Sequence, residues 1–328
     1  MTEPATAEPA MTGDTRAFSS YYGRPVLKPP VWGWKIPAYL FAGGLSAGSA
    51  LLAAGADLTG RPALRRAGRL GGLGGLLAST YLLVADLGRP ERFHHMLRVA
   101  KPSSPMSVGT WILVGYSPGI GLTATAEAAG LLPDSIRTSL PGRLLTASAR
   151  PAGLSAAAFS PGVATYTAAL LAQTAVPAWH EARRELPFVF AGSAAASAGG
   201  LGMLLAPVAE AGPARRLSAV GAAAEVAASW LIEHRPGVVT EAYTTGRARK
   251  LRRLSAILTV GGAVAAVSAA RSNRVVAAAA GLSLLAGSAL QRFGTFTAGV
   301  ASAEDPKYTV LPQRARLEDT AALPPSRV

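Results

Sequence analysis

Long apolar segments recur along the whole chain, and they limit its possible folds more than any other feature. Each is at least about 18 residues long, enough to cross a hydrocarbon core of roughly 30 Å as an α-helix. A lipid-exposed backbone must satisfy its own hydrogen bonds, and the alternation typical of a β-barrel is missing. Only 15% of the residues are charged. We therefore expect an all-α integral membrane protein without a sizeable water-soluble domain.

The hydropathy of the chain predicts eight transmembrane helices. They cover residues 36–56, 68–87, 106–132, 154–176, 186–209, 217–232, 251–270 and 275–290. Only a short polar link separates the last two, so they should form a helical hairpin. Outside the spans lie a polar N-terminal tail, residues 1–35, and a polar C-terminal tail, residues 292–328. The N-terminal tail contains no apolar core of a cleavable signal peptide.

The lysines and arginines are shared unequally between the two sides of the predicted bundle. Eight spans put both termini on one side, and 21 of the 32 Lys and Arg residues fall there. Because cytoplasmic loops carry the excess of these residues, we expect both termini in the cytoplasm and the chain in a bacterial plasma membrane. The net charge of +14 is spread over short runs between apolar segments, which argues against nucleic-acid binding.

The chain has no cysteine and four histidines, and this limits its redox chemistry. Without thiolates it cannot hold a cysteine-ligated iron–sulfur cluster or form a disulfide. Haem-bearing quinol subunits usually place axial histidines inside their spans. Here His94, His95, His180 and His234 all lie at span ends on the side of the termini. We therefore expect no haem or metal in this chain.

The segment most suggestive of chemistry follows the second span and reads Asp-Leu-Gly-Arg-Pro-Glu-Arg-Phe-His-His-Met-Leu, residues 86–97. Its glycine and proline should end the helix, which leaves Asp86 in the last turn, with Arg89, Arg92, His94 and His95 close behind. One interpretation is an interfacial cap with arginines that extend toward the headgroups. The other is a polar pocket that exchanges a proton and hydrogen-bonds a ligand oxygen.

Aromatic residues precede two of the spans on the same side. Trp34 and Tyr39 lie at the start of the first span, and Trp111 lies in the first turns of the third. Together with the segment after the second span, these lead-in segments would gather aromatic, carboxylate, imidazole and guanidinium groups. Such a set suits an amphipathic ring compound such as a quinone headgroup. An aromatic belt at headgroup level explains the tryptophans equally well.

Three sequence blocks resemble the NrfD/polysulfide reductase family of membrane subunits. The blocks are Trp-x-Trp-x-x-Pro-x-Tyr-x-Phe-x-Gly-Gly-x-x-Ala-Gly (residues 32–48), Asp-Leu-Gly-Arg-Pro-Glu-Arg-Phe (86–93) and Ser-Pro-Met-Ser-x-Gly-Thr-Trp (104–111). The segment 302–314 is also similar to the C-terminal tail of that family. The part between about residues 122 and 288 matches only in hydropathy.

The resemblance implies a quinone-reactive subunit of eight helices arranged as two four-helix bundles, here residues 36–180 and 181–291. It implies quinone chemistry in the first bundle, with menaquinone or ubiquinone as bound substrate. The implied partners are a ferredoxin-like four-cluster iron–sulfur subunit and a molybdopterin catalytic subunit. On this hypothesis the chain is not catalytic alone, and it passes electrons between the iron–sulfur partner and the quinone pool.

Roles for individual residues follow as hypotheses. Asp86, with His94 or His95, would exchange the proton that accompanies quinone redox change. Arg89 and Arg92 would orient the headgroup or dock the partner, and the quinone would contact the aromatic residues Trp34, Tyr39 and Trp111.

Acidic residues within the spans suggest a proton path through Asp57, Glu127 and Glu225. Glu225 lies near the middle of the sixth predicted span, where a carboxylate costs several kcal/mol unless it is paired or protonated. Asp57, Glu127 and Glu210 lie toward span ends, where solvation at the interface is the alternative explanation.

Two other functions are consistent with the composition. A secondary transporter would show inverted repeats and helices broken within the membrane. Pro118, Pro161 and the glycines of residues 199–202 could interrupt spans, but no repeat between the two halves is visible. The other alternative is a structural membrane anchor without quinone chemistry.

Overall fold

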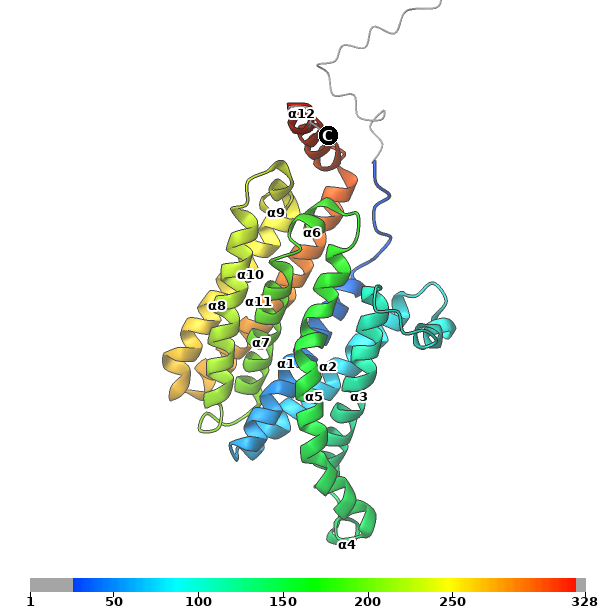
Figure 1. Ribbon diagram of the computed structural model, residues 1–328. Coiled ribbons are helices and arrows are strands. Elements are labelled where there is room, and N and C mark those ends of the chain that lie inside the picture. The colour runs from blue at the N-terminus through cyan, green and yellow to red at the C-terminus, as the bar shows by residue number, and fades with distance from the viewer. Residues whose placement is uncertain (1–25, 323–328) are drawn as a thin grey trace, which may run out of the picture.

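The computed structural model describes residues 26–322, and all regular structure in that range is helical. Most of the predicted N-terminal tail, residues 1–25, lies outside the described residues, as do residues 323–328. The long helices run side by side (Figure 1). They are α1 (Lys35–Leu58), α2 (Pro62–Asp86), α3 (Pro105–Ala129), α5 (Leu140–Ala172), α7 (Leu186–Leu205), α8 (Gly212–Glu233), α10 (Gly246–Val267) and α11 (Arg274–Glu304).

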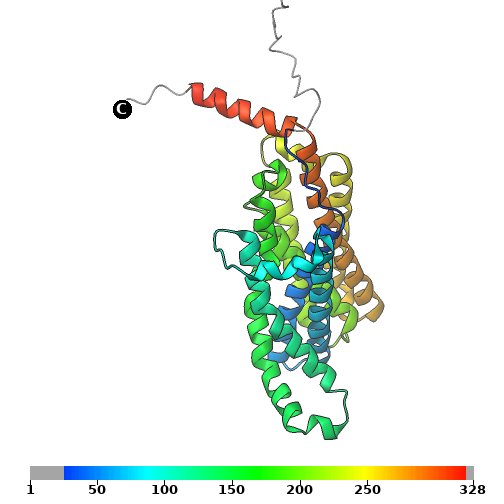
Figure 2. The ribbon, with the colours of Figure 1, turned by 90° about the vertical axis from the view of Figure 1, so that its right-hand side faces the viewer.

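Shorter helices lie at the ends of the long ones. The main examples are η2 (Pro90–Leu97), α4 (Asp134–Arg137), α6 (Pro177–Glu181) and α9 (Glu241–Thr244). The last helix, α12 (Lys307–Ala322), leads away from the helical body (Figure 2). Lys307 at its start donates a hydrogen bond to the Glu241 carboxylate at 3.0 Å, and this bond raises the pKa of Lys307.

Within residues 26–322, four helices are long and apolar enough to cross a membrane: α1, α5, α7 and α11. A fifth is reached if α2 and η2 are taken as one span, broken by a bend of 111°. The structure therefore confirms an all-helical chain with several candidate spans. The eight spans and the two bundles stay predictions.

Polar side chains and prolines mark where several of the helices begin. Ser104 precedes α3, and its Oγ accepts a hydrogen bond from the Ser107 amide at 3.5 Å. Asn273 precedes α11, and its Oδ1 accepts from the amides of Val275 and Val276 at 2.9 and 3.2 Å. Proline occupies the first turn of α3. The amides of a first turn have no partner within the helix, so the missing N–H of proline costs no hydrogen bond.

Helix α1 lies against α2, α5, α7 and α11, so it is central to the packing. The first two long helices are in contact, and glycines of both helices lie close to neighbouring backbone. A Cβ at Gly75 of α2 would lie 2.8 Å from the Ala42 carbonyl oxygen of α1. Gly48 of α1 faces α7 instead, where a Cβ would lie 2.4 Å from the Ala194 carbonyl oxygen.

Two predicted boundaries differ from the structure by more than three helical turns. Helix α5 begins at Leu140, well before the predicted start at residue 154. Helix α11 continues past the predicted end at residue 290 to Glu304, so the boundary placed at residue 292 falls inside a helix. The charge of Arg292 suggested a span end, but its side chain is buried between helices.

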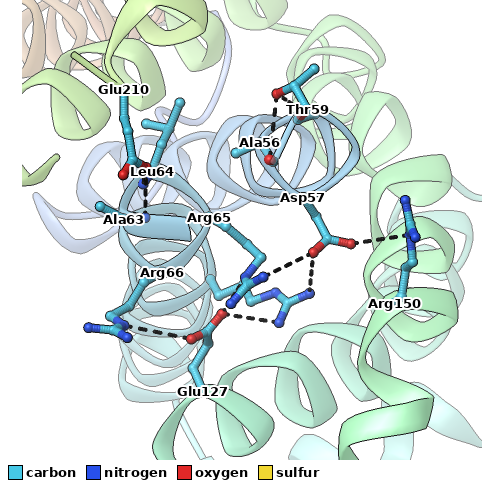
Figure 3. A network of polar contacts seen from close by, with 12 residues as sticks. Ala56, Asp57, Thr59, Ala63, Leu64, Arg65, Arg66, Glu127, Arg150 and Glu210 are labelled. Atoms are coloured by element: carbon cyan, nitrogen blue, oxygen red, sulfur yellow. Dashed lines mark hydrogen bonds and ion pairs between the residues drawn. The ribbon is translucent and has the colours of Figure 1, made fainter. Parts of the chain in front are cut away.

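Glu210, in the connection between α7 and α8, holds the start of α2. Its Oε2 accepts hydrogen bonds from the amides of Ala63 and Leu64 at 2.7 and 3.1 Å (Figure 3). Because a helix start leaves amides unbonded, Glu210→Ala should lower the free energy of unfolding by about 1–2 kcal/mol. Thermal unfolding of the purified chain measures the change. Glu304→Ala removes an exposed carboxylate and is the control; equal effects of both variants would contradict the capping role.

Candidate functional site

The predicted quinone-binding segment lies where α2 ends and the chain bends into η2. Asp86 is the last residue of α2 and is half-buried. Among the described residues, its carboxylate forms no hydrogen bond or ion pair with any partner. Lys35, at the start of α1, donates a hydrogen bond from Nζ to the Ala85 carbonyl oxygen at 2.7 Å. An unpaired carboxylate therefore lies at the junction of α2 and η2, next in the chain to the residue whose carbonyl oxygen Lys35 binds.

Helix η2 carries the predicted basic and imidazole groups on its surface. The side chains of Arg89, Arg92, His94 and His95 are all exposed. The two imidazole rings lie edge to face with centroids 4.5 Å apart. No described contact joins any of these four residues to Asp86. The structure thus brings the two histidines together and leaves them, with the arginines, open to solvent or to a partner.

Tyr39 joins the first sequence block to the third. Its buried hydroxyl hydrogen-bonds the hydroxyl of Tyr166 in α5. The ring of Tyr166 in turn lies over Gly109 of α3, where a Cβ would come within 2.2 Å of it. Gly109 therefore leaves the space that Tyr166 fills. Tyr166 was not predicted from the sequence, because nothing around it in α5 distinguishes it from an ordinary core tyrosine.

The predicted tryptophans face outward. Trp34 is 65% exposed and Trp111 is 41% exposed. The most buried tryptophan is Trp179 of α6, which no sequence pattern had singled out. It is fully buried, stacks on Trp32 at 6.0 Å between ring centroids, and donates from Nε1 to the Thr295 carbonyl oxygen at 2.9 Å.

Asp57 and Glu127, two residues of the predicted proton path, lie together at the opposite ends of α1 and α3 from η2. Arginines lie between them (Figure 3). Arg65 Nε is 2.7 Å from Glu127 Oε1, and Arg65 Nη1 is 3.3 Å from Asp57 Oδ1. Arg69, 7% exposed, reaches the same two oxygens at 3.1 and 3.7 Å. Both acids are thus held in ion pairs rather than simply solvated.

Glu225, the third residue of the predicted path, belongs to a separate polar group. It is 2% exposed in α8, and Thr259 of α10 donates a hydrogen bond to its Oε1 at 3.4 Å. The main positive charge acting on it is that of Arg292 of α11, which is 1% exposed, although the two side chains form no ion pair within the described residues. Arg292 donates to the Phe190 carbonyl oxygen at 2.8 Å, and its guanidinium lies 3.7 Å from the centroid of the Phe190 ring.

No hydrogen bond or ion pair among the described residues links Glu225 to Asp57 or Glu127. A continuous path through all three acids is therefore not formed by direct contacts. Within the same range, no three His, Asp or Glu side chains are grouped as ligands for a metal ion.

Several apolar helices long enough to cross a bilayer, with charged groups gathered at their ends, define the class of this chain as a multi-pass membrane protein. Residues 25–221 match the family described as polysulphide reductase, NrfD. The chain belongs to the NrfD family, which confirms the resemblance. Among curated proteins, no sequence gives a match.

Members of this family are membrane subunits of reductases, and they generally associate with iron–sulfur and molybdopterin subunits. The matched range includes the three sequence blocks, Tyr166 and the ion pairs of Asp57 and Glu127. It ends before Glu225, and it does not reach α10 or α11.

Proposed function

We propose that this chain is the quinone-reactive membrane subunit of a multi-subunit respiratory oxidoreductase. In this function it exchanges electrons between an iron–sulfur partner and the quinone pool, with menaquinone or ubiquinone as substrate. The observation that carries the proposal is Asp86, an unpaired, half-buried carboxylate where α2 bends into the basic helix η2.

Reduction of a quinone adds protons to its two carbonyl oxygens as electrons arrive. A protonated Asp86 would donate a hydrogen bond, and then the proton, to one of these oxygens. Because the carboxylate has no protein partner, it is free to do so. His94 and His95 lie a short way along the chain, exposed to water, and imidazole is well suited to return the proton from solvent.

The exposed arginines of η2 support docking of a partner on this face. The guanidinium groups of Arg89 and Arg92 form no hydrogen bond or ion pair among the described residues, so they remain available to carboxylates of an iron–sulfur subunit. A molybdopterin subunit would bind through that partner. Tyr39, Trp34 and Trp111 would flank the quinone from the neighbouring helices.

The proposal includes the membrane arrangement. Helices α1, α2, α3 and α5 would form the quinone-binding bundle, and α7, α8, α10 and α11 the second bundle. The contacts of α3 with α5, of α7 with α8 and of α10 with α11 support this division. Both termini would lie in the cytoplasm, as the distribution of lysine and arginine suggests.

Replacing Asp86 tests the proposal. Asp86→Asn keeps the shape and the ability to hydrogen-bond, but it removes the exchangeable proton. In the assembled complex we expect quinone-coupled turnover to fall about a hundredfold, with binding of a quinone analogue changed much less. Turnover is measured with a soluble quinone, and assembly by copurification of the partners.

Asp134→Asn is the matched control, because Asp134 is an exposed carboxylate beyond the other end of α3. It should leave turnover unchanged. Normal turnover in Asp86→Asn would remove Asp86 from the chemistry. A complex that neither binds a quinone analogue nor reacts with quinone would favour a structural anchor.

A further inference from the structure

The end of the molecule opposite η2 contains a large open cavity. It has a volume of about 660 Å³ and lies between the ends of α1, α2, α3 and α5, beside α4. Five arginines line it: Arg65, Arg66, Arg69, Arg137 and Arg150. We call this set the arginine cluster. The proposed quinone function uses none of these residues.

Positive charge exceeds negative charge in this cavity. Asp57 and Glu127 are the acidic residues of its lining, and Arg137 also pairs with Asp134 at 3.0 Å. Each oxygen of Asp57 and Glu127 already has an arginine nitrogen within 3.7 Å. These acids therefore have no capacity left to compensate further cations, and the surplus positive charge would attract an anion.

Two members of the arginine cluster have free donors. The side chains of Arg66 and Arg150 are 59% and 61% exposed. Each has one carboxylate contact, Arg66 to Glu127 at 3.7 Å and Arg150 to Asp57 at 3.5 Å, and neither forms a described hydrogen bond. Arginine presents a planar set of N–H donors that fits phosphate oxygens, so these two side chains are placed to bind one.

The remaining walls of the cavity are mainly apolar, with Thr125, Ser139 and Thr146 as their polar residues. Leu132, Ile136 and Leu145 line it, and beside them Leu140 and Leu144 are 70% and 61% exposed on α5. Asp57 lies in the last turn of α1, an apolar helix long enough to span a bilayer, so the cavity lies at the level of a membrane boundary. A ligand that combines phosphate with hydrocarbon fits such walls better than a free phosphate ion.

We propose that the arginine cluster binds the phosphate of an anionic phospholipid. Arg66 and Arg150 hold the phosphate, and Arg65 and Arg69 remain paired with the two acids beneath it. The acyl chains run along the exposed leucines of α5. The site fixes a lipid at the end of the molecule away from η2, and it is independent of the quinone proposal.

Lipid titration of the purified full chain tests this site, with bound lipid counted by native mass spectrometry. Dioleoylphosphatidylglycerol is the anionic probe, and dioleoylphosphatidylcholine is its zwitterionic match. We expect preferential binding of the anionic lipid, and a loss of affinity of about 25-fold in the double variant Arg66→Gln/Arg150→Gln, since each arginine contributes about fivefold. Turnover of the complex is a separate readout, so failure of one proposal does not imply failure of the other.

Three further measurements complete the test. Arg143→Gln removes an exposed arginine of α5 outside the cavity and should leave the affinity unchanged. Arg66→Lys/Arg150→Lys keeps the charge and should retain most of the binding, which tests the site even if the glutamine variant does not fold. Millimolar inorganic phosphate should not displace the lipid. Equal binding of both lipids, equal loss in Arg143→Gln, or displacement by phosphate would overturn the proposal.

Discussion

Replacing Arg292 with methionine is expected to lower the free energy of unfolding by about 3–5 kcal/mol, the usual cost of leaving a buried charge without compensation. Arg292 is 1% exposed, and its positive charge acts on the Glu225 carboxylate, which is 2% exposed. Methionine fills much of the same volume, but it leaves the Glu225 carboxylate without a counter-charge and the Phe190 carbonyl oxygen without its donor. Both groups lie between helices, where water cannot replace the lost interactions.

The measurement is thermal unfolding of the purified chain in one detergent, together with the yield of monodisperse protein. Arg253→Met, on the exposed side of α10, removes an arginine without burying a charge and should change little. The double variant Arg292→Met/Glu225→Leu should recover much of the lost stability, because no unpaired charge remains. If the double variant is as unstable as Arg292→Met, the loss comes from packing and not from Glu225.

The helices themselves were largely predictable from the sequence. Each long helix was identified from the length of its apolar segment, because a membrane span must form its backbone hydrogen bonds internally and contain few charged residues. Glu225 was also recognised as buried, since a carboxylate inside an apolar segment has few other places to lie. The structure confirms that burial at 2% exposure.

Buried arginines were the main error. Arg69, Arg252 and Arg292 are 7%, 3% and 1% exposed, yet in the sequence they resemble charges at span ends. Their burial depends on partners supplied by other helices: Glu127 for Arg69, Glu233 for Arg252, and Phe190 with Glu225 for Arg292. Hydropathy along one segment contains no information about such partners, so the end of α11 was placed too early.

The candidate site was predicted only in part, because its contacts between helices are also not visible in any single segment of the sequence. The sequence blocks identified Tyr39 and Asp86, and Gly109 lay within one of them. The residue that connects Tyr39 to Gly109 is Tyr166, more than a hundred positions away from Tyr39 along the chain. The contact between the two tyrosines depends on how α1 packs on α5, which no local pattern specifies.

Substitutions at two glycines of α1 should have effects of opposite sign. At Gly48 a Cβ would lie 2.4 Å from the Ala194 carbonyl oxygen and 2.7 Å from the Ala198 Cβ, both in α7. A backbone carbonyl cannot rotate aside, so Gly48→Ala must push α1 and α7 apart. We expect a loss of about 3 kcal/mol in the free energy of unfolding. At Gly55 a Cβ would meet nothing within 4 Å, so Gly55→Ala should stabilise the chain by up to about 1 kcal/mol.

Thermal unfolding of the two variants in the same detergent measures this difference. Both replacements add one methyl group to the same helix and raise its helix propensity equally, so propensity cancels and only the contact with α7 remains. Association of helices in lipid depends on close backbone approach, because no hydrophobic drive brings them together. Gly48 therefore sets the distance between α1, which carries Tyr39, and α7, which carries Phe190. Equal unfolding temperatures for the two variants would show that α1 and α7 do not depend on this contact.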